Sequence, residues 1–126
     1  DFIRAMNKKA EDLGATNTHF TNPSGLEGDG KQYTTVVDLL IITEYALRNP
    51  TFAKTVATYE HEIAETRDHK YFILYNETNL LTTYPGVLGF KTGYTPEAGY
   101  TLITLARENN HEVIGVLLGS PFCAMR

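Results

Sequence analysis

Three consecutive residues, Lys91, Thr92 and Gly93, carry the groups best suited to bind an anionic ligand. Lys91 supplies a fixed positive charge, and the Thr92 hydroxyl can donate a hydrogen bond to a carboxylate. Gly93 has no side chain, so an extended ligand backbone can lie against it, as an added strand does at a sheet edge. On an edge strand beside a cleft the three would form a peptide-carboxylate site. The plainer interpretation of Lys91 is a solvated lysine on a strand.

Two other chemistries fail on spacing. The pairs at 61–62 and 111–112 each begin like a His-Glu-x-x-His zinc motif, but neither has a histidine at the fifth position. The segment 86–93 has glycines ahead of Lys-Thr like a phosphate-binding loop, but Phe90 separates the nearest glycine from the lysine. We therefore expect no metal site and no cofactor.

Composition narrows the possible partners. The chain has 126 residues, a formal net charge of −4 and a hydrophobic content of 42%, which suits one globular domain or a large piece of one. It has no basic cluster, so nucleic acid is not an expected partner. Its longest apolar stretch, 36–46, is interrupted by polar residues and falls short of the roughly 18 residues that a membrane helix needs. The single cysteine, Cys123, excludes an internal disulfide.

The first part of the chain is predicted to be helical and then irregular. Apolar residues at helical spacing predict an amphipathic helix over 2–13, with Gly14 as its C-terminal cap. The polar stretch 15–33 predicts a long loop with turns at 22–25 and 28–30. A loop of this length either carries function or wraps the domain.

A second helix is predicted over 36–47. Thr34 or Thr35 can cap it, and Asn49-Pro50 is expected to stop it. Because its residues are apolar nearly all round, we expect this helix to be central and buried.

The second half of the chain has the alternation and turns of a β structure. A helical turn is expected within 76–84, and Asn109 and Asn110 suit a tight hairpin because asparagine tolerates positive φ. Strands are predicted over 57–63, 71–75, 87–92, 98–107 and 112–118. Helices followed by an antiparallel sheet indicate the α+β class.

The surroundings of Lys91 resemble a known family. Five separated motifs, in the same order along the chain, are similar to those of the D-alanyl-D-alanine carboxypeptidases, the low-molecular-mass penicillin-binding proteins. They are Met6-Asn7-x-Lys9-Ala10-x-x-Leu13-Gly14, Thr18-His19-Phe20-x-Asn22-Pro23-x-Gly25-Leu26, Thr34-Thr35-x-x-Asp38-Leu39, Asn79-x-Leu81, and Tyr84-Pro85-Gly86-Val87-x-Gly89-x-Lys91-Thr92-Gly93-Tyr94-Thr95-x-x-Ala98-Gly99-Tyr100.

The resemblance implies a partial penicillin-binding-protein or β-lactamase-like transpeptidase fold. It implies removal of the terminal D-alanine from peptidoglycan stem peptides through an acyl-enzyme on a serine, and acylation of that serine by β-lactams. Lys91, Thr92 and Gly93 would be active-site residues. Tyr94, through its N–H in an oxyanion hole, and Thr95 would complete the substrate-binding strand. The implied location is the bacterial cell envelope outside the cytoplasm, with membrane attachment only through regions absent from this chain.

The sequence departs from the family pattern in one decisive respect. The family places its nucleophile in Ser-x-x-Lys and a second element in Ser-x-Asn, but the two serines here, Ser24 and Ser120, begin neither motif. We therefore interpret residues 1–120 as the later portion of a catalytic domain and 121–126 as an unassigned tail. The chain alone is expected to be inactive.

Two alternatives remain open. One keeps the fold and changes the reaction, to a β-lactamase or a transpeptidase. The other is a non-catalytic cell-wall-binding module that retained the Lys-Thr-Gly strand without the serine.

Overall fold

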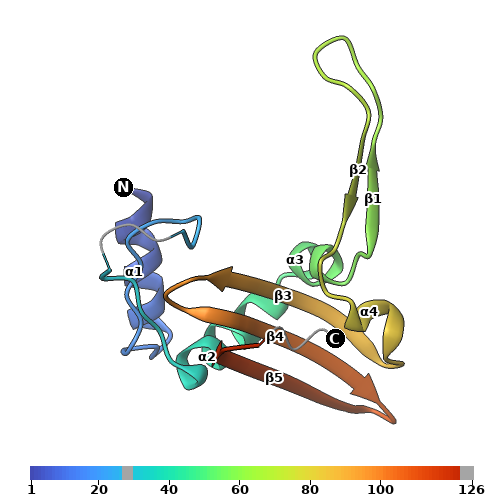
Figure 1. The fold of residues 1–126 in the computed structure, drawn as a ribbon. Coiled ribbons are helices and arrows are strands. Elements are labelled where there is room, and N and C mark those ends of the chain that lie inside the picture. The colour runs from blue at the N-terminus through green and yellow to red at the C-terminus, as the bar shows by residue number, and fades with distance from the viewer. Residues whose placement is uncertain (27–29, 123–126) are drawn as a thin grey trace.

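The computed structural model describes residues 1–26 and 30–122, and its elements follow the α+β order (Figure 1). The three-stranded sheet has the order β3-β4-β5, all antiparallel, so β3 is an edge strand. The elements are α1 (Phe2–Asp12), α2 (Val36–Leu47), α3 (Pro50–Val56), β1 (Glu60–Ile63), β2 (Phe72–Tyr75), α4 (Leu80–Thr83), β3 (Val87–Thr95), β4 (Gly99–Glu108) and β5 (His111–Ser120).

The turn between β4 and β5 follows its sequence. Asn109 and Asn110 both have positive φ, 48° and 65°, the geometry of a two-residue turn that matches the twist of its strands. The two strands it joins each have ten residues. The predicted hairpin is confirmed, and the strands extend slightly beyond their predicted ends.

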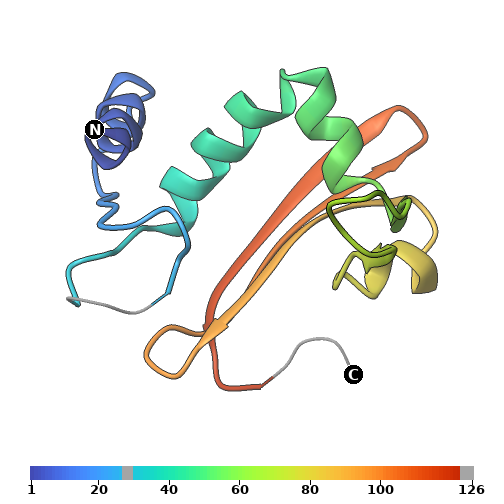
Figure 2. The same cartoon turned by 90° about the horizontal axis from the view of Figure 1, so that it is seen from above.

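The helix α2 begins as predicted but is not buried as predicted. Thr35 is its N-cap, and its side chain accepts a hydrogen bond from the Asp38 N–H. Only Asp38 and Thr43 of this helix are buried, whereas Val37 is 64% exposed. Figure 2 shows α2 and α3 along one face of the sheet, so α2 contacts the sheet with only part of its surface. A helix that is apolar on all sides is stable only when other parts of the protein cover all of its surface. The described residues cover only one side of α2.

The helix α3 is absent from the sequence prediction, because Asn49-Pro50 also has the pattern of a helix stop. Asn49 is the N-cap of α3, with its Oδ1 accepting from the Thr51 and Phe52 N–H groups. Pro50 is the first helical residue, where its missing N–H costs nothing. The strand predicted from residue 57 therefore begins only at Glu60, because Ala57 ends the helix. The new helix places Phe52 against Phe90 of β3, with ring centroids 5.6 Å apart.

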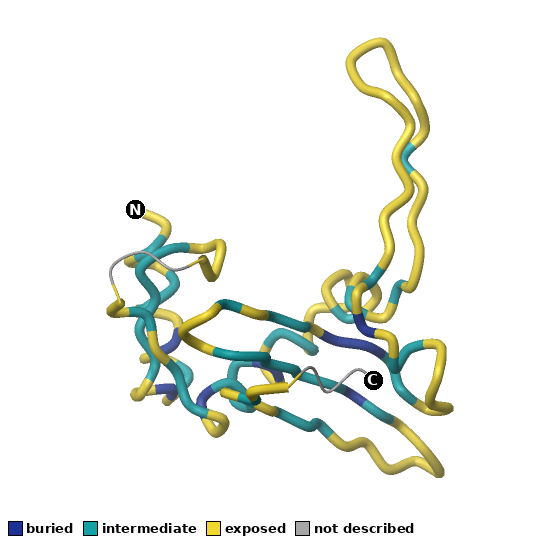
Figure 3. Tube along the Cα trace, in the orientation of Figure 1, coloured by how far each residue is buried: buried dark blue, intermediate teal, exposed yellow. Residues whose placement is uncertain are grey.

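The strands β1 and β2 form a separate hairpin that projects from the rest of the molecule (Figure 3). All four residues of β2 are exposed. The described chain as a whole has 9293 Å² of accessible surface, whereas a folded monomer of this mass exposes about 6,700 Å². Much apolar surface that a domain of this size would bury therefore remains uncovered.

The loop between α1 and α2 is held in place by the buried carboxylate of Asp38. The carboxylate, on a residue only 3% exposed, accepts hydrogen bonds from the Asn17 N–H at 2.7 Å and the Thr18 hydroxyl at 2.8 Å. Farther along the loop, His19 and Tyr33 form a β-bridge. The turn predicted at 28–30 falls largely outside the described residues.

Replacing Asp38 should test how firmly this loop is held. We expect Asp38→Ala to lower the free energy of unfolding by about 1–3 kcal/mol, because two partly buried hydrogen bonds lose their acceptor. Asp38→Asn, which keeps one acceptor oxygen, should cost less. Urea denaturation followed by circular dichroism measures both, and equal stability of all three proteins would contradict this role of Asp38.

Candidate functional site

The five residues predicted to bind substrate, Lys91 to Thr95, line one cleft. It has a volume of about 800 Å³ and lies between β3, the segment that connects α1 to α2, and Glu77. In Figure 1 the end of β3 approaches that connecting segment. The cleft therefore runs beside an edge strand, as the site proposed from the sequence requires.

Lys91 and Thr92 present the polar groups of the strand. Lys91 is exposed, and its ammonium group donates a hydrogen bond to the Thr92 carbonyl oxygen. Thr92 is half-buried, and its hydroxyl donates to Glu77 Oε2 at 3.3 Å. Among the described residues that line the cleft, Lys91 is the only base and Glu77 the only acid. The described lining of the cleft thus has one basic side chain and one acidic side chain, and the acidic one accepts the hydrogen bond of the Thr92 hydroxyl.

Packing against the neighbouring strand explains why residue 93 is a glycine, and the sequence alone did not show this. It pairs with Thr101 on β4, and a Cβ at position 93 would lie 2.7 Å from the Thr101 hydroxyl oxygen. Contacts under 3.0 Å essentially never occur for real Cβ atoms, so the Thr101 side chain occupies the space that a larger residue would need. A glycine at this position therefore lets β3 pair with β4 without a clash.

Tyr94 and Thr95 shape the end of the strand. The Tyr94 ring lies on Tyr100 of β4, with centroids 4.4 Å apart, and Tyr94 remains 57% exposed. The Thr95 hydroxyl accepts from the Ala98 N–H at 3.1 Å and so closes the turn between β3 and β4. The side chain of Tyr94 thus packs on the sheet surface.

Ser24 is the one serine that lines the cleft, among the residues that the structure describes, but it has no base beside it. Its hydroxyl donates to Asn22 Oδ1 at 3.0 Å, and an amide oxygen does not take up a proton near neutral pH. The hydroxyl of Ser120 donates to the Phe122 carbonyl oxygen at 2.7 Å. Neither serine is arranged as an activated nucleophile, which needs a general base within hydrogen-bond reach.

Glu77 is the cleft residue that sequence reasoning missed. It lies between β2 and α4, fifteen residues before Thr92, on a segment held by Asn76. The Asn76 amide donates to the Val56 carbonyl at 3.1 Å, and its Oδ1 accepts from the Thr78 N–H at 2.9 Å. The family-like motif nearby, Asn79-x-Leu81, marked this segment as part of the pattern but did not single out Glu77.

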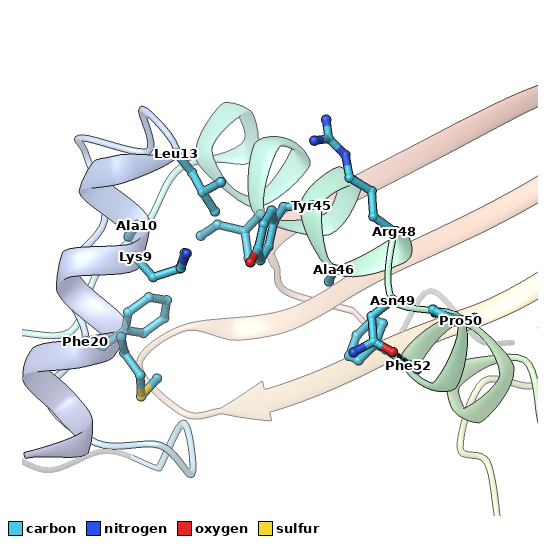
Figure 4. A pocket seen from close by; sticks show the side chains of 12 residues that line it. Lys9, Ala10, Leu13, Phe20, Tyr45, Ala46, Arg48, Asn49, Pro50 and Phe52 are labelled. Carbon is cyan, nitrogen blue, oxygen red and sulfur yellow. Dashed lines mark hydrogen bonds between the residues drawn. The ribbon is translucent and has the colours of Figure 1, made fainter.

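A second hollow lies between α1, α2 and α3 and has a different character. Figure 4 shows Lys9 and Leu13 facing Tyr45, and the Lys9 ammonium is 5.1 Å from the centre of the Tyr45 ring. Its volume is about 690 Å³, and no Ser, Cys, His, Asp or Glu is among the described residues that line it. With no nucleophile and no acid–base pair, this hollow is an apolar groove and not a reaction site.

Comparison with known proteins decides the family. Residues 1–121 match the D-alanyl-D-alanine carboxypeptidase family, peptidase S11. The chain belongs to this family. The resemblance drawn from the five motifs is therefore confirmed.

Curated relatives of this carboxypeptidase family match nearly all of the chain. The D-alanyl-D-alanine carboxypeptidase DacF of Bacillus subtilis is 40% identical over 120 residues, which are 95% of this chain and 30% of DacF. DacB2 of Mycobacterium tuberculosis is 40% identical over 119 residues, 93% of this chain and 40% of DacB2. The chain thus spans less than half the length of these carboxypeptidases.

The fold is also that of the family. The crystal structure of the Streptomyces K15 DD-transpeptidase superposes with a TM-score of 0.87 at 37% identity, covering 94% of this chain and 47% of that one. A D-alanyl-D-alanine carboxypeptidase from Mycobacterium tuberculosis superposes with a TM-score of 0.83 at 36% identity, covering 92% and 44%. The predicted α+β fold of helices on an antiparallel sheet is confirmed as part of the DD-peptidase fold.

The helices of this carboxypeptidase-family chain are short. The longest that the structure describes, α2, has 12 residues. Within residues 1–26 and 30–122, none has the length and apolar character that crossing a membrane requires.

Proposed function

We propose that this chain supplies the substrate-binding strand of a serine-type D-Ala-D-Ala carboxypeptidase that trims peptidoglycan stem peptides. The observation that carries the proposal is the position of Lys91, Thr92 and Gly93 on an edge strand of the sheet that lines a cleft. An extended peptide can add to this edge through backbone hydrogen bonds. β-Lactams, which acylate the serine of such enzymes, are the second ligand class of the same site.

Each residue of the strand has a proposed part. The Lys91 ammonium attracts the terminal carboxylate of the stem peptide, and the Thr92 hydroxyl donates a hydrogen bond to it. Gly93 leaves the strand open to the peptide backbone. The Tyr94 N–H is proposed to stabilise the developing oxyanion, and Thr95 to hold the adjoining turn.

The nucleophile is proposed to come from outside residues 1–126. The sequence has no Ser-x-x-Lys and no Ser-x-Asn, and the hydroxyls of Ser24 and Ser120 donate to an amide and to a backbone carbonyl. The large accessible surface, 9293 Å², supports further chain packing on these elements. Residues 1–120 are thus proposed to be the later portion of a catalytic domain that acts in the cell envelope without a cofactor, and 121–126 a tail of no assigned function.

Binding by the chain itself tests the proposal. We expect N-acetyl-D-Ala-D-Ala to shift backbone amide resonances of β3 in an NMR titration, and Lys91→Ala to weaken binding about ten-fold through loss of a charge-assisted hydrogen bond. Lys70→Ala removes the same charge from the exposed end of the β1–β2 hairpin and should change nothing. No binding by the unaltered chain, or equal binding by Lys91→Ala, would refute the site.

A transpeptidase is the second candidate, because the Streptomyces K15 neighbour is described as a DD-transpeptidase in its structure and as a D-alanyl-D-alanine carboxypeptidase among the curated relatives. The two reactions share the donor peptide and differ in the acceptor, an amine or water. Reading the coding sequence ahead of Asp1 separates both from the non-catalytic alternative. An in-frame Ser-x-x-Lys followed by Ser-x-Asn supports an enzyme, and an unrelated domain there supports a cell-wall-binding module.

A further inference from the structure

The acidic residue of the cleft, Glu77, sits where an anionic ligand would bind. Its neighbours fix its position, since the Asn76 amide donates to the carbonyls of Val56 and Thr58 at 3.1 and 3.3 Å. On the other side, Thr78 is only 1% exposed and anchors the segment in the fold. Glu77 itself is exposed and lines the cleft, and these contacts of Asn76 and Thr78 hold its backbone in place.

The carboxylate of Glu77 already uses the hydroxyl that the ligand needs. Thr92 Oγ1 donates its hydrogen bond to Glu77 Oε2 at 3.3 Å. A hydroxyl has one proton to donate, so Thr92 cannot donate to a ligand carboxylate and to Glu77 at the same time. Within residues 1–26 and 30–122, no Lys, Arg or His lies in an ion pair with Glu77, so its charge is not neutralised by a direct partner there.

We propose that Glu77 determines the ligand selectivity of the cleft by competing with an anionic ligand for the Thr92 hydroxyl. The inference rests on the proposed function, in which Thr92 binds the terminal carboxylate of a peptide. Two effects act together: the ligand must displace Glu77 from the hydroxyl, and the two carboxylates repel each other. Glu77 therefore weakens binding of a C-terminal carboxylate and leaves a neutral C-terminus little affected.

The test compares two ligands and two substitutions. Glu77→Gln keeps the size of the side chain and removes its charge, and Glu77→Ala removes both the charge and the acceptor. We expect Glu77→Ala to bind N-acetyl-D-Ala-D-Ala about five-fold more tightly than the unaltered chain, the size of one exposed charge interaction. Glu77→Gln should gain less, because its amide oxygen can still accept the hydrogen bond of the Thr92 hydroxyl. Binding of the C-terminal amide of the same peptide should not change. Glu108→Gln, at the exposed end of β4, alters the net charge equally and should match the unaltered chain.

A double-variant cycle shows whether the effect passes through the hydroxyl. In Thr92→Val the donor is gone while the side-chain shape is kept, so adding Glu77→Ala should recover only the part of the gain that comes from charge repulsion. A gain that is undiminished in the Thr92→Val background would overturn the competition for the hydroxyl. Circular dichroism of each variant confirms that the fold is retained.

The outcomes separate this inference from the proposed function. If the unaltered chain binds the carboxylate peptide and Glu77→Ala binds it equally or more weakly, competition by Glu77 is wrong while the proposed function stands. If neither the chain nor its Glu77 variants bind either peptide, the proposed function fails and the inference with it. Tighter binding of the carboxylate peptide alone supports both.

Discussion

The isolated chain is expected to release no D-alanine from a peptide ending in D-Ala-D-Ala and to form no covalent adduct with penicillin. The chain has two serines, and their hydroxyls donate to the Asn22 side-chain amide and to the Phe122 carbonyl. Neither acceptor can remove the proton from the attacking oxygen. In a serine peptidase, loss of the nucleophile or its base lowers kcat by about 10⁶-fold, so release should be indistinguishable from a blank without protein.

Two measurements check this expectation. A D-alanine assay measures turnover, with a full-length carboxypeptidase of the same family, such as the Bacillus subtilis relative, as the positive control. Intact-mass spectrometry after incubation with penicillin measures acylation. Release of D-alanine, or a mass increase by one penicillin, would contradict the expectation. Ser24→Ala would then show whether the serine that lines the cleft is responsible.

The sheet was predictable because its signals are local. Asn109 and Asn110 favour positive φ on their own account, and the alternating residues on either side define the strands that they join. Lys91, Thr92 and Gly93 lie within such a strand. Because this strand is at an edge of the sheet, the three residues can line a cleft. The order of the motifs also identified the family, a conclusion that needed no structure.

The sequence analysis missed helix α3 because the residues before it have two possible meanings that the local sequence does not distinguish. Asn49-Pro50 ends α2 and begins α3 with the same two residues, because proline is excluded from a helix interior but favoured at its first position. Only the packing of Phe52 on Phe90 shows that the chain turns and continues as a helix. The prediction that α2 is buried was wrong for a related reason, because burial depends on what covers the helix and not only on the residues of the helix itself.

The site residues that were missed depend on contacts across the fold. The hydrogen bond between Glu77 and Thr92 joins residues fifteen positions apart on different elements. The restriction on Gly93 comes from Thr101 of the neighbouring strand. Periodicity within one element carries no information about either contact, so these residues become visible only when the strands and the preceding segment are placed together.

Replacing Gly89 should have the largest effect on stability of any glycine substitution in the described chain. Gly89 has a φ of +101°, lies at a register shift between β3 and β4, and a Cβ there would approach the Val56 carbonyl oxygen to 2.2 Å. The obstacle is backbone at the end of α3, which cannot move as a flexible side chain can. We expect Gly89→Ala to lower the free energy of unfolding by about 3–5 kcal/mol, from backbone strain and the clash together.

Gly14→Ala separates the two causes. Gly14 has a φ of +87° after the end of α1, and no atom lies within 4 Å of the place that a Cβ would take. Alanine there therefore meets only the left-handed backbone cost of about 1 kcal/mol. Urea denaturation of both variants measures the difference. Equal losses of stability would show that the Val56 carbonyl yields, and would contradict a rigid junction between α3 and β3.

The consequence of Gly89→Ala extends to the cleft. The Val56 carbonyl that a Cβ would displace also accepts the Asn76 amide hydrogen bond, and Asn76 holds the segment that carries Glu77. Lys91 follows two residues after Gly89 on the same strand. We therefore expect the folded molecules of Gly89→Ala to bind N-acetyl-D-Ala-D-Ala more weakly than Gly14→Ala does. The same NMR titration measures both affinities. Unchanged binding in folded Gly89→Ala would show that the cleft is positioned independently of the α3–β3 junction.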